Sequence, residues 1–187
     1  EYNPFEATKV NVLGTENLIR ASIQNNISKF LLISTDKVVD PTTVLGSTKL
    51  LAEKIVVNSN LNKGQKKITF SVVRFGNVIG TRGSVLPKFI MQAKQNGSLT
   101  VTDKLSTRFF VTVDNAVNAI LLSLEKMRGG EIFIPKTINS LNIYDLAQSI
   151  SKNYKNNKKI KIIGLRGGEK VHEKILTELE FFRLKIY

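Results

Sequence analysis

Two short apolar runs limit the folds that are open to this chain. Lys29–Ser34 reads KFLLIS, a short apolar run without polar alternation, and Ile68–Arg74 reads ITFSVVR, a second mainly apolar run. Such runs are typical of strands that are covered on both faces, as in parallel sheets flanked by helices. A helical pattern precedes each run, at Pro4–Gln24 and at Val44–Val57. Because alternating helices and strands indicate crossover units, the sequence predicts an α/β fold.

The same kind of pattern predicts the other elements. Asn3 before Pro4 is a helix-start signal, because an amide side chain can cap the helix and proline fits its first turn. In this first helix we expect buried side chains at Phe5, Val12, Leu18, Ile19 and Ile23. After a polar loop at Asn58–Lys67, the chain predicts helices at Ser84–Gln95, Asp114–Met127, Ile143–Lys152 and Glu169–Leu179, and strands at Leu99–Thr102, Glu131–Pro135 and Ile160–Gly164.

Composition narrows the classes of function. The 187 residues are 42% hydrophobic and include no cysteine, so the core of about one domain is possible and a disulfide framework is not. No apolar run is long enough to predict a membrane segment, and His172 has no companion ligands for a metal. These features favour a soluble, cytoplasmic protein.

The charge of the chain indicates an anionic partner. Lysine and arginine number 28 against 15 acidic residues, which gives a net charge of +13. Lysines cluster only at Lys63–Lys67 and Lys152–Lys161, beside turn-like asparagine and glycine, so we interpret the clusters as solvated faces. A nucleotide-linked substrate is therefore favoured over a membrane surface, and nucleic-acid binding is an alternative that rests on charge alone.

The candidate chemistry lies where the first apolar strand ends. The quartet Ser34–Lys37 (STDK) follows that strand, at the edge where open α/β sheets bind ligands. In the next helix, Leu45 and Lys49 are four residues apart and share one face. Gly46 is less favourable in a helix than alanine by about 1 kcal/mol, which indicates a close approach to the helix backbone. By residue pattern alone, a solvated lysine and a surface ion pair are the alternative interpretation.

Several separated motifs occur in an order that resembles one enzyme family. They are EYNPFEATKVNVLGTENLI at 1–19, STDK at 34–37, the Leu45 to Lys49 spacing, RFGNVIGTRGSVLPKF at 74–89, TRFFVT at 107–112, GGEIFIPK at 129–136 and GLRGGEKVHE at 164–173. Together they resemble the UDP-N-acetylglucosamine 4,6-dehydratases, which are extended short-chain dehydrogenase/reductases of surface-glycan synthesis. The resemblance covers nearly the whole chain.

This resemblance implies a domain organisation. The fold would be the carboxyl-terminal half of a doubly wound, Rossmann-like parallel sheet with a smaller α+β substrate-binding region. Residues 1–80 would form part of an NAD(P)-binding domain, to which 108–127 return, and residues 81–107 and 128–187 would bind the sugar nucleotide. The phosphate-binding turn G-x-x-G-x-x-G does not occur in the chain. We therefore expect a longer protein, of which this chain is the carboxyl-terminal part.

The resemblance also assigns roles at the quartet. In the family, a bound NAD or NADP takes hydride from sugar C4, C5 loses a proton, water leaves from C6 and the hydride returns to C6. Lys37 would be the base at C5, Asp36 the acid that protonates the departing hydroxyl, and Thr35 a contact to the sugar. Lys49 would assist by its charge while it holds the nicotinamide ribose. The implied cofactor-binding set is Ser34, Leu45, Lys49 and Val78.

The other implied contacts are to the sugar nucleotide. Arginine suits a diphosphate because its planar guanidinium binds phosphate through two hydrogen bonds. Asn77 would contact the sugar and Glu169 the uridine ribose. The implied substrate-binding set is Thr35, Asn77, Arg82, Thr102, Ser106, Arg108, Arg166 and Glu169. No metal site is expected, and His172 is interpreted as structural.

One position departs from the family pattern. Leu45 stands where the superfamily usually has the tyrosine that takes the C4 hydroxyl proton, so that proton would pass to Asp36, Lys37 or water. The hypothesis is a C5-inverting UDP-N-acetylglucosamine 4,6-dehydratase that works as a homo-oligomer, with the Pro4–Gln24 helix as a possible interface. The alternatives are a UDP-sugar 4-epimerase and a non-catalytic or degenerate UDP-sugar binder.

Overall fold

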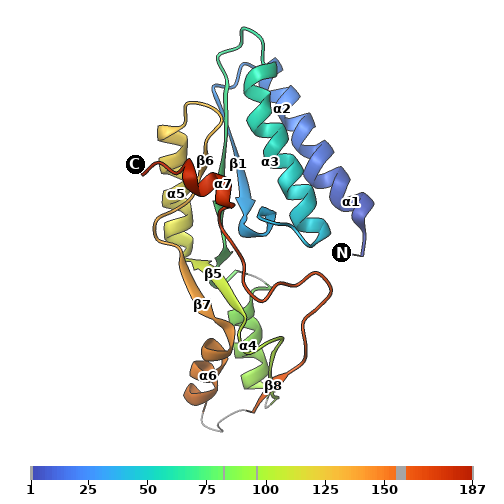
Figure 1. Ribbon diagram of the computed structural model, residues 1–187, viewed down its shortest axis with the longest axis vertical. Coiled ribbons are helices and arrows are strands. Elements are labelled where there is room, and N and C mark those ends of the chain that lie inside the picture. Colours follow the sequence, from blue (N-terminus) through green and yellow to red (C-terminus); the bar gives the residue numbers. More distant parts are fainter. Residues whose placement is uncertain (1, 82, 96, 155–158, 187) are drawn as a thin grey trace.

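The computed structural model describes residues 2–81, 83–95, 97–154 and 159–186. It is elongated: a sheet flanked by helices lies at one end and a smaller α+β region at the other (Figure 1). Strands β5 (Thr107–Val111) and β7 (Asn139–Asn142) connect the two ends. None of the described helices is long and apolar enough to cross a membrane.

The larger sheet is parallel and centred on β2 (Thr69–Phe75). β1 (Lys29–Thr35) pairs with β2 along its whole length, with Lys29 opposite Thr69 and Thr35 opposite Phe75. β6 (Ile132–Phe133) pairs with the other edge, which gives the order β1-β2-β6. Every residue of β2 after Thr69 is buried, as expected for a strand covered on both faces. The predicted α/β fold with a parallel sheet is confirmed.

Helices cover both faces of this sheet (Figure 1). α3 (Val44–Asn62) packs on β1 and β2 with α2 (Gly14–Gln24) beside it, and α5 (Val113–Lys126) packs on the other side. Because side chains of a strand alternate between faces, β2 contributes to two cores. Phe70 and Val72 face the α2/α3 side, and Val73 and Phe75 face the α5 side.

The helix predicted at Pro4–Gln24 forms as one run of α1 (Pro4–Thr8), a π-helical turn (Lys9–Leu13) and α2. Val12 and Ile19 are buried and Ile23 half-buried, as predicted. Phe5 and Leu18 are exposed, so the prediction was wrong for these two. A π-helical turn holds more residues than an α-helical turn, so it rotates Phe5 off the face on which Val12 and Ile19 are buried. Leu18 directly precedes Ile19 in the helix and therefore lies outside that buried face.

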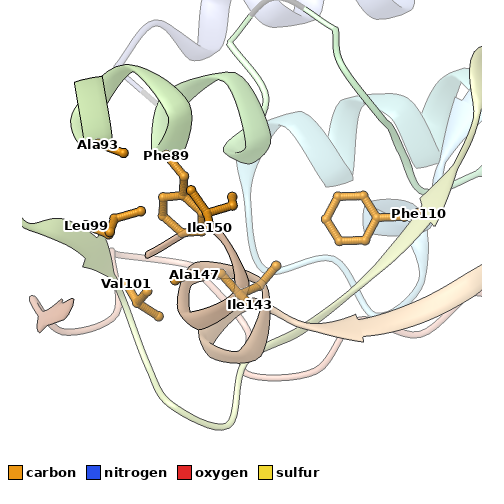
Figure 2. Close-up of a cluster of buried hydrophobic side chains, with 8 residues drawn as sticks. All are labelled: Phe89, Ala93, Leu99, Val101, Phe110, Ile143, Ala147 and Ile150. Atoms are coloured by element: carbon orange, nitrogen blue, oxygen red, sulfur yellow. The ribbon is translucent and has the colours of Figure 1, made fainter. Parts of the chain in front are cut away.

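The smaller region has its own core. α4 (Val85–Lys94) and α6 (Ile143–Asn153) pack with the parallel pair of β4 (Leu99–Val101) and β8 (Ile160–Ile162). Figure 2 shows their buried side chains, with Phe89 of α4 beside Ile150 of α6. β5 lies between β3 (Asn77–Val78), to which it is parallel, and β7, to which it is antiparallel.

The structure corrects three of the predicted elements. α3 continues to Asn62, and β7 was not predicted at all. The helix predicted at Glu169–Leu179 is absent except for its last two residues, which begin α7 (Glu178–Phe182).

Residues 163–177, which lie between β8 and α7, form the covering segment. Two hydrogen bonds tie it to the loop after β1: Thr42 Oγ1 donates to the Gly168 carbonyl at 2.6 Å, and the Lys170 side chain donates from Nζ to the Val39 carbonyl at 2.7 Å.

Candidate active site

The carboxyl end of β1 places an acid and an amine side by side. Thr35 ends the strand and caps the short 3₁₀ turn Asp36–Val38 that follows it. The Asp36 side chain is fully buried, and its Oδ1 accepts hydrogen bonds from Thr35 Oγ1 at 2.8 Å and from Lys37 Nζ at 2.9 Å. A bond of this length between an ammonium and a carboxylate is charge-assisted, so the pair is held in a defined geometry.

Lys37 links this buried carboxylate to a pocket. Its side chain is 29% exposed and lines a hollow of about 250 Å³. Thr42 and Thr43 form one wall of the hollow, and residues of the covering segment form another. An amine in this position can reach a bound molecule while it stays bonded to Asp36.

Gly46 explains how the following helix fits beside the pair. The Thr43 side chain caps α3 by accepting from the Gly46 amide at 3.0 Å. A Cβ atom at position 46 would lie 2.4 Å from the carbonyl oxygen of Lys37. The close approach inferred from this glycine therefore comes from the chain's own Asp36–Val38 turn.

Leu45 and Lys49 lie at the amino-terminal end of α3. Lys49 Nζ is 3.4 Å from the carbonyl oxygen of Ile33 on β1, and Leu45 is 45% exposed. Neither residue lines the hollow beside Lys37. Ser34, at the end of β1, is buried, and its hydroxyl oxygen has no hydrogen-bond partner within the described residues.

A second hollow, of about 230 Å³, gathers most of the predicted substrate contacts. Phe89, Phe110 and Ile143 give it an apolar side. Its predicted polar members come from three separate stretches of the sequence, near residue 77, at 102–108 and at 166–169. They are Asn77, Thr102, Ser106, Arg108, Arg166 and Glu169.

The two hollows share Arg108, Arg166 and Glu169. Arg108 Nη2 donates to Glu169 Oε1 at 2.7 Å, and its Nη1 donates to the Thr107 and Val171 carbonyls. Thr102 Oγ1 donates to the same Glu169 oxygen at 3.0 Å. The guanidinium is thus fixed between the hollows, where an anionic ligand can meet it.

The structure leaves other predicted residues apart from the hollows. Val78 packs in the core beneath α5, and Thr35 bonds to Asp36 without lining either hollow. Arg82 lies outside the described residues. His172 is not on a helix, contrary to the expectation; it lies next to β5, with its Nδ1 2.9 Å from Thr107 Oγ1.

Sequence reasoning missed a buried ionic cluster beneath the site. Arg74 of β2 is 1% exposed and donates to both carboxylate oxygens of Glu53 on α3 and of Glu180 on α7, and to the Ile175 carbonyl. Burial alone would raise the pKa of Glu180, but hydrogen bonds from Arg74 and Thr177 lower it to about 2. The sequence contains a signal for this cluster. Arg74 ends the apolar run ITFSVVR, and an arginine in a buried strand needs a buried partner.

Buried polar atoms without partners gather at the site. Within the described residues, five side-chain atoms are buried and lack a hydrogen-bond partner. One belongs to Ser84, and the others are Ser34 Oγ, Asp36 Oδ2, Ser106 Oγ and Glu173 Oε2. Because native structures leave few such atoms unpaired, this concentration fits a site whose ligands complete the hydrogen bonds.

Comparison with known proteins places the chain in a family. Residues 1–185 match the family described as Polysaccharide biosynthesis protein. The chain belongs to this family. A UDP-N-acetylglucosamine 4,6-dehydratase (inverting) of Campylobacter jejuni is 43% identical, over 95% of this chain and 52% of its own length. A UDP-glucose 4-epimerase of Rickettsia canadensis is 39% identical, over 95% of this chain and 52% of its own.

A solved structure of similar sequence has the same fold. The X-ray structure of Pen from Bacillus thuringiensis matches with a TM-score of 0.91 at 40% identity, covering 97% of this chain and 57% of that one. The chain therefore spans about half the length of these two relatives and 57% of the solved structure that it matches.

Proposed function

We propose that this chain supplies the acid–base pair and the sugar-nucleotide pocket of a UDP-N-acetylglucosamine 4,6-dehydratase, of the C5-inverting kind. The observation that carries the proposal is the buried Asp36 bonded to the pocket-lining Lys37 at the end of β1. The 43% identity to a Campylobacter jejuni protein of that name supports it. The product would be a UDP-4-keto-6-deoxy amino sugar for surface glycans.

The Asp36–Lys37 bond suits an elimination. One proton transfer along the 2.9 Å contact converts an ammonium and a carboxylate into an amine and a carboxylic acid. The amine of Lys37 would then take the C5 proton, and the acid of Asp36 would protonate the C6 hydroxyl as it leaves as water. Leu45 takes no part in these proton transfers, since its side chain has no ionisable group.

The cofactor would lie on the other side of the pair. Bound NAD or NADP would supply the hydride exchange between C4 and C6. Ser34, Leu45, Lys49 and Val78 are the proposed cofactor contacts, and the unpartnered hydroxyl of Ser34 fits such a role. Residues 1–80 with 108–127 would then belong to the cofactor domain, and the rest to the sugar-nucleotide region. The exposed apolar residues of α1 and α2, such as Phe5 and Leu18, would serve a homo-oligomer interface.

The first prediction tests the base. The chain is joined to the amino-terminal half of the Campylobacter jejuni relative, given UDP-N-acetylglucosamine, and the 4-keto product is measured by mass spectrometry. Lys37→Ala should lower kcat by about 100-fold or more, the usual contribution of a positioned general base. Lys54→Ala, an exposed lysine of α3, is the matched control. Undiminished turnover in Lys37→Ala would remove the proposed base.

The 39% identity to a UDP-glucose 4-epimerase makes epimerisation the second candidate. An epimerase uses the same kind of cofactor but eliminates no water, so it has no need of the Asp36–Lys37 pair. Formation of a C4 isomer without loss of water would select it. UDP binding without either product would instead favour a non-catalytic sugar-nucleotide binder.

A further inference from the structure

Glu173 is a buried carboxylate to which the proposed reaction assigns no role. Its side chain is 7% exposed and lines the same hollow as Lys37. Its Oε2 atom is buried and accepts no hydrogen bond within the described residues. This is the kind of acceptor that a polar ligand satisfies.

Lys170 does not satisfy this carboxylate. Its Nζ is 3.5 Å from Glu173 Oε2, longer than the roughly 2.7–2.9 Å of a charge-assisted hydrogen bond. The same Nζ donates instead to the Val39 carbonyl at 2.7 Å, which ties the covering segment to the loop after β1. The other acid of the hollow, Glu169, is fully engaged by Arg108, Thr102 and the Arg166 amide. Glu173 is therefore the acid of the hollow that still lacks a donor.

The location of Glu173 indicates which part of a ligand would meet it. A diphosphate is excluded as its partner, because two anions repel each other. The proposed cofactor contacts Leu45 and Lys49 do not line this hollow, whereas Lys37 does. Lys37, the proposed base at sugar C5, thus shares this hollow with Glu173, which favours a donor on the sugar as the partner of Glu173.

We propose that Glu173 accepts a hydrogen bond from a hydroxyl or amide N–H of the hexose, and so orients the ring in front of Lys37. This inference rests on the proposed function, because it takes a UDP-linked sugar as the ligand. It assigns to Glu173 a role in sugar selection that is separate from the acid and base.

Calorimetric titration of the 187-residue chain with UDP and with UDP-N-acetylglucosamine tests this role. Glu173→Ala should weaken binding of the sugar nucleotide about tenfold or more and leave the affinity for UDP within about twofold, because UDP lacks the hexose. Glu173→Gln keeps the shape and a neutral acceptor, so it should weaken sugar-nucleotide binding by a smaller factor. Glu125→Gln, an exposed acid of α5, should change neither affinity.

A purely structural role gives different results. If Glu173 served only as a partner for Lys170, Glu173→Gln would lower the thermal midpoint of the ligand-free chain and reduce both affinities together. Either result would overturn the inference, and so would a wild-type chain that binds UDP-N-acetylglucosamine no more tightly than UDP. The turnover assay with the Lys37→Ala variant is separate, so a failure of the dehydratase proposal can be told from a failure of this one.

Discussion

At the scale of single residues, Arg74 shows how a buried charge is satisfied in this chain. All five of its N–H donors are used: Nε and Nη2 bond to Glu53, Nη1 and Nη2 to Glu180, and Nη1 also to the Ile175 carbonyl. Removing one member of such a cluster leaves a buried charge without compensation. The cluster therefore matters more for stability than the surface ion pairs do.

The second prediction follows from this cluster. Arg74→Ala should lower the free energy of unfolding by about 3–5 kcal/mol, because Glu53 is left almost fully buried without its partner. Arg20→Ala removes an exposed pair with Glu16 and should change it by at most about 0.5 kcal/mol. Urea unfolding followed by circular dichroism measures both. Equal losses in the two variants would contradict the argument.

Individual site residues could be predicted from sequence only in part. The Asp36–Lys37 pair was found because it directly follows an apolar strand, and the structure joins the two by a hydrogen bond. Glu53 and Glu180 were missed because their partner Arg74 is 21 and 106 residues away in sequence. Glu173 was missed for a related reason, since burial of its carboxylate depends on contacts of the covering segment that no local pattern reveals.

At the scale of elements, the amino-terminal end of α3 is shaped by the turn that carries the pair. A helical glycine normally weakens its helix, yet at Gly46 any side chain would collide with the Lys37 carbonyl. Gly14, in the helical run before β1, has no such neighbour: a Cβ there would meet its nearest atom, the Lys9 carbonyl oxygen, at an ordinary 3.5 Å. The two positions form a natural comparison.

The third prediction uses this comparison. Gly46→Ala should lower the free energy of unfolding by about 1–3 kcal/mol through overpacking, and should lower kcat by displacing Lys37. Gly14→Ala should raise the free energy of unfolding by about 0.5–1 kcal/mol, because alanine favours the helix. Thermal and urea unfolding measure the stability of each variant, and the turnover assay measures its kcat. A stabilising Gly46→Ala would refute the close approach.

Elements set by a local sequence pattern were predicted, and elements that depend on contacts with distant parts of the chain were not. The two apolar runs form β1 and β2 because burial on both faces selects continuous hydrophobic strands. The helix expected at Glu169–Leu179 failed because Gly168, with φ +77°, and Lys170 are held by the loop after β1. Strand β7 was missed because its sequence, NSLN, becomes a strand only by pairing with β5.

At the scale of the whole molecule, an ion pair with a buried arginine joins the last helix to the central sheet. α7 reaches the sheet through Glu180, whose carboxylate bonds to the buried Arg74, and Thr177 and Glu180 form a capping box at the start of the helix. The pKa of Glu180 is lowered to about 2 by Arg74 and Thr177, against the effect of burial. A carboxyl group whose pKa is lower in the folded state stabilises that state wherever it is ionised.

The fourth prediction concerns acid. The contribution of Glu180 should be complete above about pH 4.5 and be lost as the pH falls toward about 2. Glu180→Gln should therefore lower the free energy of unfolding by about 1–2 kcal/mol at pH 7 and by almost nothing near pH 2. The value at pH 7 is smaller than the pKa shift alone would give, because solvent screens this partly exposed carboxylate. Urea unfolding at several pH values measures the difference. A constant difference across that range would exclude ionisation as the cause.

The covering segment has a consequence for how this protein is made. Both hollows take walls from residues 166–169, and α7 ties that stretch down through a side chain at position 180. During synthesis these residues leave the ribosome after Asp36 and Lys37 and after every strand in the described residues. A chain released before residue 166 would hold Asp36 and Lys37 beside half-built walls. If the proposed function holds, such truncated products should bind a sugar nucleotide more weakly than the 187-residue chain does.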